Sequence, residues 1–250
     1  MKINQKVFIV TGGASGLGKA TATLLLENEA KVAVLDLNES DITPSESLLF
    51  CKTDVRSEEE VQAAIAQTIA KFGKIDGVVN CAGIGPPKRV VGKEGPHDLD
   101  FFKKVVDINL VGTFNVIRLA ANEIQNNAPD EGGERGIIIN TASVAAYDGQ
   151  IGQAAYAASK GGIVSMTLPI AREFARMGVR VMAIAPGIFE TPLLAGLPQE
   201  AQDSLGKQVP FPPRLGKPAE FAALVIHIIQ NSMLNGEVIR LDGAIRMGAK

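Results

Sequence analysis

A tyrosine and a lysine four positions apart, Tyr156 and Lys160, are well suited to proton transfer in this 250-residue chain. Residues four apart lie on the same face of a helix. A tyrosine, with a pKa near ~10, is a poor base at neutral pH, but an adjacent ammonium favours the phenolate and lowers that pKa. Such a pair can give a proton to a carbonyl oxygen or take one from a hydroxyl. Taken alone, the spacing is equally typical of a solvent-facing helix.

Ser143 completes a candidate catalytic group with this pair. It follows an apolar run, residues 137–140, that has the composition of a buried strand. Open sheets of parallel strands bind ligands outside the carboxyl ends of the strands, which is where Ser143 falls. We therefore expect the Ser143 hydroxyl to hydrogen-bond the same substrate oxygen that exchanges a proton with Tyr156.

A glycine-rich turn, residues 11–18, connects the first apolar run to the first helical pattern. Glycines let the backbone turn tightly and approach a pyrophosphate, and the helix start offers free N–H groups and a positive dipole end. An ordinary strand-to-helix turn is the alternative, but the placement between a strong strand and a helix favours dinucleotide binding. The expected contacts are Gly12, Ser15, Gly16, Leu17 and Gly18.

Asp36 indicates which dinucleotide is bound. It ends the second apolar run, where a carboxylate can accept hydrogen bonds from the adenosine ribose and repel a 2′-phosphate. The alternative is a carboxylate that only caps a turn at the strand end. Because Gly13, Ala14 and Leu37 offer no cation to a 2′-phosphate, the sequence favours NAD over NADP.

The elements that must position these residues alternate along the whole chain. Apolar and β-branched runs predict strands at residues 7–11, 32–35, 48–52, 77–80, 136–141, 179–185 and 237–241. Apolar residues at three- and four-residue spacing predict helices at residues 16–29, 57–72, 99–126, 156–177 and 218–230, with a short one near 199–205. This alternation predicts an α/β Rossmann fold, a doubly wound parallel sheet with helices on both faces, as a single domain over residues 1–250.

Composition and charge exclude several classes of protein. Apolar residues make up 46% and charged residues 21%, so the chain is not intrinsically disordered. A net charge of −2 leaves no broad basic field for nucleic acid or an anionic membrane surface. No apolar run is long enough to span a membrane, and two cysteines with two separate histidines suggest no metal site. The first residues carry no signal-like or targeting-like extension, so we expect a cytoplasmic protein.

Taken in order, the motifs resemble the short-chain dehydrogenase/reductase family from residue 6 to residue 247. The matching pieces are the glycine-rich turn, Asp54-Val55, Asn80-Cys81-Ala82-Gly83, Asn109, Ser143, Tyr156-Ala157-Ala158-Ser159-Lys160, and Pro186-Gly187 followed by Thr191. The resemblance implies an NAD-dependent oxidoreductase that interconverts a secondary alcohol and a ketone. It also implies a homotetramer assembled through helices 99–126 and 156–177 and the C-terminal strand.

The same resemblance implies a role for each matching residue. Tyr156 is then the acid/base, and Lys160 binds the nicotinamide ribose and lowers the tyrosine pKa. Ser143 orients the carbonyl, and Asn109 holds a water in a proton relay. The residues implied to line the dinucleotide are Asp54 and Val55 at the adenine, Cys81, Ala82 and Gly83 by their backbone, and Phe189 and Thr191 over the nicotinamide. Cys81 stands where the family more often has a second asparagine, and we expect no loss from it.

Several segments look like the members of the family that act on L-3-hydroxyacyl-CoA thioesters, among them residues 115–119, 136–146, 152–172, 208–215 and 235–247. Residues 190–213 are expected to form a mobile lid over an acyl chain. Its predicted hinges are Pro192, Pro198 and Pro210, and its apolar cover is Leu193, Leu194, Leu197 and Leu205. Lys88, Arg89 and Lys93 form either a solvated loop or a contact for CoA phosphates.

Other functions remain open at this point. A hydroxysteroid, sugar or polyol dehydrogenase would use the same machinery on another small-molecule substrate. A non-catalytic dinucleotide sensor is a different class. The presence of all four residues Ser143, Tyr156, Lys160 and Asn109 argues against a sensor, which has no need of them.

Overall fold

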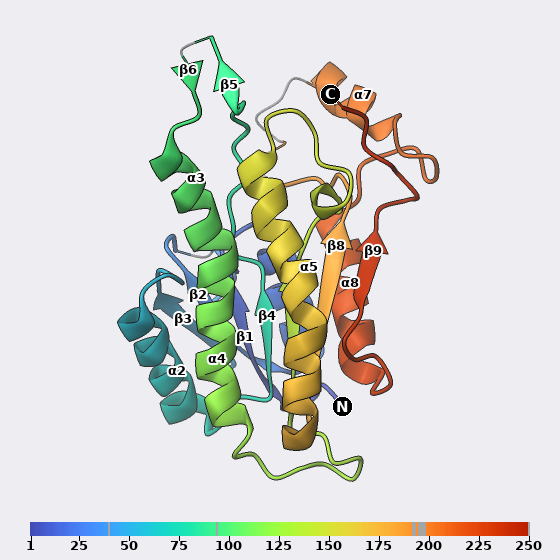
Figure 1. Cartoon of the computed structure of the whole chain (residues 1–250). Coiled ribbons are helices and arrows are strands. Elements are labelled where there is room, and N and C mark those ends of the chain that lie inside the picture. Colours follow the sequence, from blue (N-terminus) through green and yellow to red (C-terminus); the bar gives the residue numbers. More distant parts are fainter. Residues whose placement is uncertain (40, 94, 192–193, 195–198, 250) are drawn as a thin grey trace.

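A seven-stranded parallel sheet runs through the centre of the molecule (Figure 1). The computed structural model describes all residues except 40, 94, 192–193, 195–198 and 250. The strands follow the order β3 (Leu48–Lys52), β2 (Lys31–Asp36), β1 (Val7–Thr11), β4 (Gly77–Asn80), β7 (Gly136–Thr141), β8 (Val179–Pro186) and β9 (Val238–Leu241). Every pair in this sheet is parallel, which confirms the predicted doubly wound Rossmann fold.

Helices cover both faces of the sheet, because successive strand residues point to opposite faces and both sets are apolar. Phe8 and Val10 pack in one core beneath α1 (Gly16–Glu27) and α8 (Pro218–Gln230). Ile9 packs in the other core, beneath α2 (Glu58–Phe72), α4 (Gly112–Ile124) and α5 (Ala154–Phe174). The near-continuous apolar strands therefore follow from burial on two sides.

The long helix predicted at residues 99–126 is in fact interrupted. It consists of α3 (Leu99–Val106), a π-helical turn (Asp107–Val111) and α4, which ends at Ile124. A π turn inserts one extra residue into the helix and is often found at functional sites. The inserted turn contains Asn109, which is fully buried, so the irregularity lies at one of the predicted site residues.

The stretch 85–98, predicted as an irregular connection, contains a small antiparallel hairpin, β5 (Val91–Gly92) and β6 (Gly95–Pro96). The predicted short helix near 199–205 is confirmed as α7 (Gln199–Gly206). In Figure 1 the hairpin and α7 both stand at the upper end of the molecule, where the strands end. The chain begins at the opposite end, among the amino ends of the strands.

Candidate active site

Ser143 and Tyr156 meet at the carboxyl end of β7. Ser143 lies in extended backbone just before a 3₁₀ turn (Val144–Ala146), and its hydroxyl accepts a hydrogen bond from the Ala145 N–H at 3.1 Å. Tyr156 lies in the first turn of α5 and shares a side-chain hydrogen bond with Ser143. The structure thus brings together the serine and tyrosine that the sequence separates by thirteen positions.

The pKa of Tyr156 is shifted in the opposite direction from the one predicted. Burial raises it above the ordinary tyrosine value, and the hydrogen bond with Ser143 only partly offsets this. The Lys160 ammonium lies 5.8 Å from the centre of the tyrosine ring and donates instead to the Thr141 carbonyl at 2.7 Å. The lysine is therefore near the tyrosine, as its spacing indicates, but its nearest partner is a backbone oxygen.

Lys160 is a buried cation. Its side chain is almost wholly buried, and burial lowers its pKa to about 8. Burial also raises the pKa of the neighbouring Cys81 thiol to about 11, so the thiol supplies no counter-charge at neutral pH. The thiol sulfur accepts a weak hydrogen bond from the Thr141 hydroxyl at 3.5 Å. Sequence reasoning missed Thr141, although its position at the end of β7 is a usable signal.

Asn109 joins two segments of the site. Its side chain accepts from the Ile84 N–H and donates to the Ile84 carbonyl, both at 2.8 Å, and also donates to the Ser159 hydroxyl at 3.0 Å. Ser159 in turn donates to the carbonyl of Tyr156 at 2.8 Å. The backbone carbonyl of Asn109 accepts a hydrogen bond from the Thr113 hydroxyl at 2.7 Å. From within the π turn, Asn109 thus fixes the chain after β4 against α5.

The glycine-rich turn has the shape that a pyrophosphate needs. Gly12 has a φ of +64°, and a Cβ there would lie 2.7 Å from the Ala82 backbone nitrogen. A Cβ on Gly18 would lie 2.2 Å from the Gly12 carbonyl oxygen. Ser15 is exposed at the N-cap of α1 and its side chain makes no capping bond. These close backbone approaches and the open helix start fit a dinucleotide.

The turn after β4 is fixed against the glycine-rich turn by Thr11, which the sequence analysis did not single out. Its hydroxyl accepts from the N–H groups of Cys81 and Ala82, both at 3.2 Å. Gly83 lies close to the site as well, because a Cβ there would be 3.1 Å from the Asn109 side-chain oxygen and 3.6 Å from the Lys160 nitrogen. Cys81, Ala82 and Gly83 therefore lie between the two halves of the candidate site.

At the adenosine end, the predicted carboxylates have distinct surroundings. Asp36 accepts from the Ala14 N–H at 3.0 Å and from the Asn38 N–H at 3.1 Å, so it lies against the glycine-rich turn. Hydrogen bonds from Arg56 hold the pKa of Asp54 below its usual range. Val55 is buried, with its carbonyl bound by Asn115 at 2.9 Å.

The predicted lid is described only in part. Pro192, Leu193, Leu197 and Pro198 lie outside the described residues, whereas Leu194, Leu205 and Pro210 lie within them. Phe189 is buried against Gly216, with which it forms an isolated parallel bridge. Thr191 is half-buried in the segment that follows β8.

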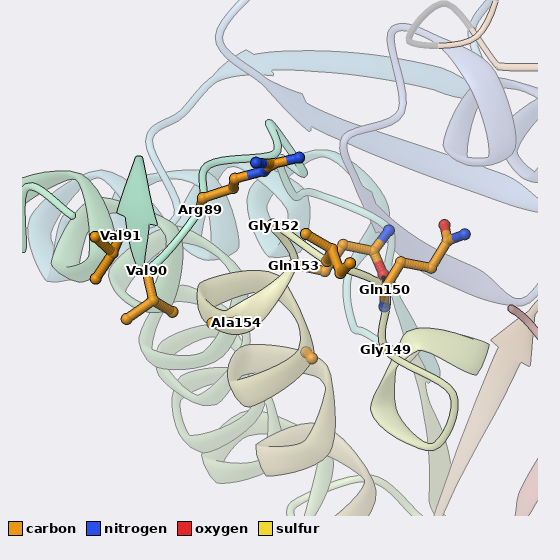
Figure 2. Close-up of a pocket in the computed structure, with 10 residues that line it drawn as sticks. Arg89, Val90, Val91, Gly149, Gln150, Gly152, Gln153 and Ala154 are labelled. Atoms are coloured by element: carbon orange, nitrogen blue, oxygen red, sulfur yellow. Dashed lines mark hydrogen bonds between the residues drawn. The ribbon is translucent and has the colours of Figure 1, made fainter. Parts of the chain in front are cut away.

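A groove of about 610 Å³ runs beside the start of α5 (Figure 2). One wall is the hairpin segment with Arg89, Val90 and Val91, and the other is the turn that includes Gln150 and Gln153. Figure 2 shows the Arg89 side chain extended above this turn. Ala154 and Ala157, two residues before and one residue after Tyr156, also line it.

Comparison with known proteins decides the family. Residues 6–202 match the family model described as short chain dehydrogenase. The chain belongs to the short-chain dehydrogenase family. It is therefore an oxidoreductase, and its family implies a nicotinamide dinucleotide cofactor, which the glycine-rich turn fits.

Curated relatives and a solved structure of this family agree along the whole chain. The chain is 58% identical to 3-hydroxyacyl-CoA dehydrogenase type-2 of Bos taurus, with 96% of this chain and 95% of the relative covered. It is 51% identical to the protein of that name in Drosophila melanogaster, with 98% and 99% covered. The crystal structure of 3-hydroxyacyl-CoA dehydrogenase type-2 from Mycobacterium avium is 40% identical, with a TM-score of 0.93 over 100% of both chains.

The described residues also bear on metal binding and on membrane insertion. No group of three or more potential metal ligands occurs among them. In the same part of the chain, none of the helices combines the length and the apolar character needed to cross a membrane.

Proposed function

We propose that the protein is an NAD-dependent dehydrogenase that interconverts L-3-hydroxyacyl-CoA and 3-ketoacyl-CoA. The observation that carries this proposal is the hydrogen-bonded pair of Ser143 and Tyr156, beside buried Lys160, next to a groove large enough for a long substrate. Relatives more than half identical over nearly their whole length, named for this activity, support it.

The chain's own residues manage the proton in this reaction. When bound, the nicotinamide accepts or supplies the hydride. In the direction of ketone reduction, Tyr156 gives its proton to the ketone oxygen while the Ser143 hydroxyl donates a hydrogen bond to the same oxygen. The raised pKa of Tyr156 keeps it in the proton-carrying form that this direction needs. In the oxidative direction Tyr156 is the base, and Lys160 is the nearby cation that favours its phenolate.

The proposed cofactor contacts are those predicted from the sequence. The N–H groups of Gly16 and Leu17 at the start of α1, with Ser15, would hold the pyrophosphate. Asp54 and Val55 would flank the adenine, and Phe189 and Thr191 would cover the nicotinamide. Lys160 would bind the nicotinamide ribose, and Asn109 would hold a water of the proton relay.

The choice of NAD over NADP rests on Asp36. Its carboxylate lies against the glycine-rich turn, and Leu37 beside it is exposed and uncharged. Replacing both, as Asp36→Ala with Leu37→Arg, removes the repulsion and adds a partner for a 2′-phosphate. We expect the ratio of kcat/KM values for NADP and NAD to rise at least ~10-fold. A wild-type protein that already prefers NADP would refute the assignment.

The groove supports a substrate that extends well beyond its reacting carbon. Val90, Val91 and Ile151 supply apolar contact, and Gln150 and Gln153 can hydrogen-bond amides, as a pantetheine arm requires. Two cations of the cluster Lys88, Arg89 and Lys93 have different surroundings in the structure. The Lys88 ammonium lies 5.0 Å from the centre of the Phe101 ring, whereas Arg89 extends over the groove. Arg89 is therefore the cation we assign to a CoA phosphate.

The test compares acetoacetyl-CoA with a pantetheine-truncated thioester. Arg89→Met should raise KM for the full thioester about 10-fold and leave the truncated one unchanged, because only the full substrate has phosphates. Lys88→Met is the matched control and should change both little. Equal losses on both substrates would remove Arg89 from the site. Wild-type turnover only on steroids, sugars or polyols would replace the proposed substrate, and NADH binding without turnover on any substrate would indicate a sensor.

We also propose a homotetramer and a substrate lid. Apolar side chains are exposed on the helices of one face, at Leu99, Val111, Phe114 and Leu168, and β9 lies at the open edge of the sheet. Contacts between subunits commonly cover exposed apolar side chains and open sheet edges of this kind. Sedimentation that gives only a monomer at micromolar concentration would contradict the tetramer.

Residues 190–213 would close over the acyl chain, and ligand-dependent protection of this segment in hydrogen exchange would test that closure.

A further inference from the structure

Arg240, on β9, binds two segments on either side of the candidate substrate region. Its guanidinium donates to the Asp148 carboxylate at 2.6 Å and to the Asp242 carboxylate at 2.7 Å. It also donates to the Ile245 carbonyl at 3.0 Å and lies 5.2 Å from the centre of the Tyr147 ring. Four groups on two separate segments therefore contact one side chain.

The first of these segments forms a wall of the groove. Asp148 begins the turn that continues through Gln150 to Gln153. This turn leads into α5, which begins two residues before Tyr156. Hydrogen bonds from Arg240 keep the pKa of Asp148 below its usual range, so the carboxylate stays charged. The turn is held a second time from the C-terminal tail, because the Ile151 N–H donates to the Ala249 carbonyl at 3.0 Å.

The second segment supports the far end of the candidate lid. The Asp242 carboxylate accepts from the Ala244 N–H at 2.9 Å and closes a turn in which Gly243 and Ala244 have φ values of +58° and +68°. The Phe211 N–H donates to the Gly243 carbonyl at 3.3 Å, and a Cβ on Gly243 would lie 2.4 Å from the Val209 side chain. An alanine in the left-handed region is strained, and such strain persists only where the surroundings hold it.

We propose that Arg240 is a positioning residue that sets substrate affinity by fixing the groove turn relative to the segment that contains Val209 and Phe211. It touches neither Ser143 nor Tyr156 nor the glycine-rich turn, so it acts on KM for the substrate and not on the chemical step or dinucleotide binding. This inference rests on the proposed function in one respect: the groove and the segment at residues 209–211 are taken as parts of the substrate region.

The test separates KM, kcat and dinucleotide affinity in the full-length enzyme. Arg240→Met should raise KM for acetoacetyl-CoA at least about 10-fold, since charge-assisted hydrogen bonds to both segments are lost. We expect kcat and the NADH dissociation constant, measured by fluorescence, to stay within about three-fold of wild type. Arg240→Lys should recover only part of the loss, because a point charge cannot bridge two carboxylates as a guanidinium fork does.

Two further variants make the result decisive. Asp148→Asn breaks the groove arm alone and should raise KM in the same way, which keeps the proposal testable if Arg240→Met does not fold. Arg246→Met is the matched control, because Arg246 also binds Asp242, at 3.2 Å, but is exposed and, in the described part of the chain, makes neither a hydrogen bond nor an ion pair with Asp148. Unchanged KM in Arg240→Met and Asp148→Asn, or an equal loss of NADH affinity, would overturn the proposal. If the wild type turns over another ketone and no acyl-CoA, the proposed substrate fails, and the same variants are compared on that ketone.

Discussion

The buried charges at the amino end of the parallel sheet have different partners from the polar side chains of the candidate site at its carboxyl end. At the amino end, the buried Asp76 carboxylate binds Lys6 at 3.0 Å, Lys74 at 2.8 Å and the Val7 N–H at 2.9 Å. On β8, buried Arg180 pairs with Glu134 at 2.8 Å. Its guanidinium also donates to the Ile228, Ile229 and Leu234 carbonyls near the end of α8. Each buried charge there has an opposite charge beside it.

Among the described residues of the candidate site, at the carboxyl end, three polar side chains have neutral partners or lack one for a polar atom. In the described part of the chain, the Lys160 ammonium hydrogen-bonds a backbone carbonyl, and half-buried Tyr156 lies against a serine. Asn140 accepts from Asn80 at 2.9 Å, but its own amide nitrogen has no partner among the described residues. Groups left unsatisfied in this way cost stability and are available to a ligand. The ion pairs at the amino end therefore stabilise the fold. The polar groups of the candidate site at the carboxyl end lower stability and are available for binding and proton transfer.

Removing the tyrosine hydroxyl tests this division most severely. Tyr156→Phe should lower turnover about 10²–10⁴-fold, because the proposed general acid/base is lost. The free energy of unfolding and NADH affinity should hardly change. The matched control is Tyr147→Phe, the other tyrosine of the chain, which should keep its activity. Turnover of Tyr156→Phe within a few-fold of wild type would show that another group carries the proton.

The lysine pKa values predict opposite pH behaviour at the two ends. Lys160 titrates near pH 8 in the folded protein and near 10.5 when unfolded, so the unfolded state holds the extra proton between these values. Stability should therefore rise with pH from 8 to 10.5, by about 3 kcal/mol relative to Lys160→Met, in chemical denaturation series. Below pH 8 the difference should be flat.

Lys6 is the control at the amino end. Although burial acts to lower it, the pKa of Lys6 is raised, because Asp76 binds and attracts its ammonium. Its contribution to stability is therefore fully present below pH 10.5 and is lost only above it. Relative to Lys6→Met, wild-type stability should show no rise between pH 8 and 10.5. A rise of equal size in both comparisons would remove Lys160 as its source.

Neutralising the carboxylate at the amino end should affect stability alone. Asp76→Asn loses charge-assisted hydrogen bonds and should cost about 2–3 kcal/mol in the free energy of unfolding. We expect kcat and KM to remain at wild-type values at temperatures where the variant is folded. Asp100→Asn, an exposed member of a pair with Lys103, is the control and should change neither property. A selective loss of kcat in Asp76→Asn would contradict the division between the two ends.

Substitutions at two glycines should give the smallest changes in stability, and they distinguish a structural glycine from one in the glycine-rich turn. Gly73 ends α2 with a φ of +88° and open space around it, so Gly73→Ala should cost about 1 kcal/mol of stability and leave NADH affinity unchanged. Gly12→Ala adds a contact with the Ala82 backbone to a similar strain and should weaken NADH binding about 10-fold or more. Equal NADH affinity in the two variants would separate the glycine-rich turn from the cofactor.

Much of this molecule follows from local sequence. The bounds of β1, β3, β4 and β7 match the predicted runs, because a strand buried on both faces must be apolar throughout its length. The spacing of Tyr156 and Lys160 on one helix, and the glycines that open α1, are likewise local patterns with local physical causes. The order of the motifs along the chain was enough to indicate the family.

Tertiary structure decided what depends on burial and on distant partners. The π turn at Asn109 could not be predicted from an amphipathic pattern. Within this turn Asn109 hydrogen-bonds Ile84 and Ser159, which are distant in the sequence. The direction of the Tyr156 pKa shift was predicted wrongly, since desolvation depends on everything packed around a side chain and not on a neighbour four residues away. Arg240 carries no motif at all, and only the folded chain brings Asp148 to it from ninety-two residues away.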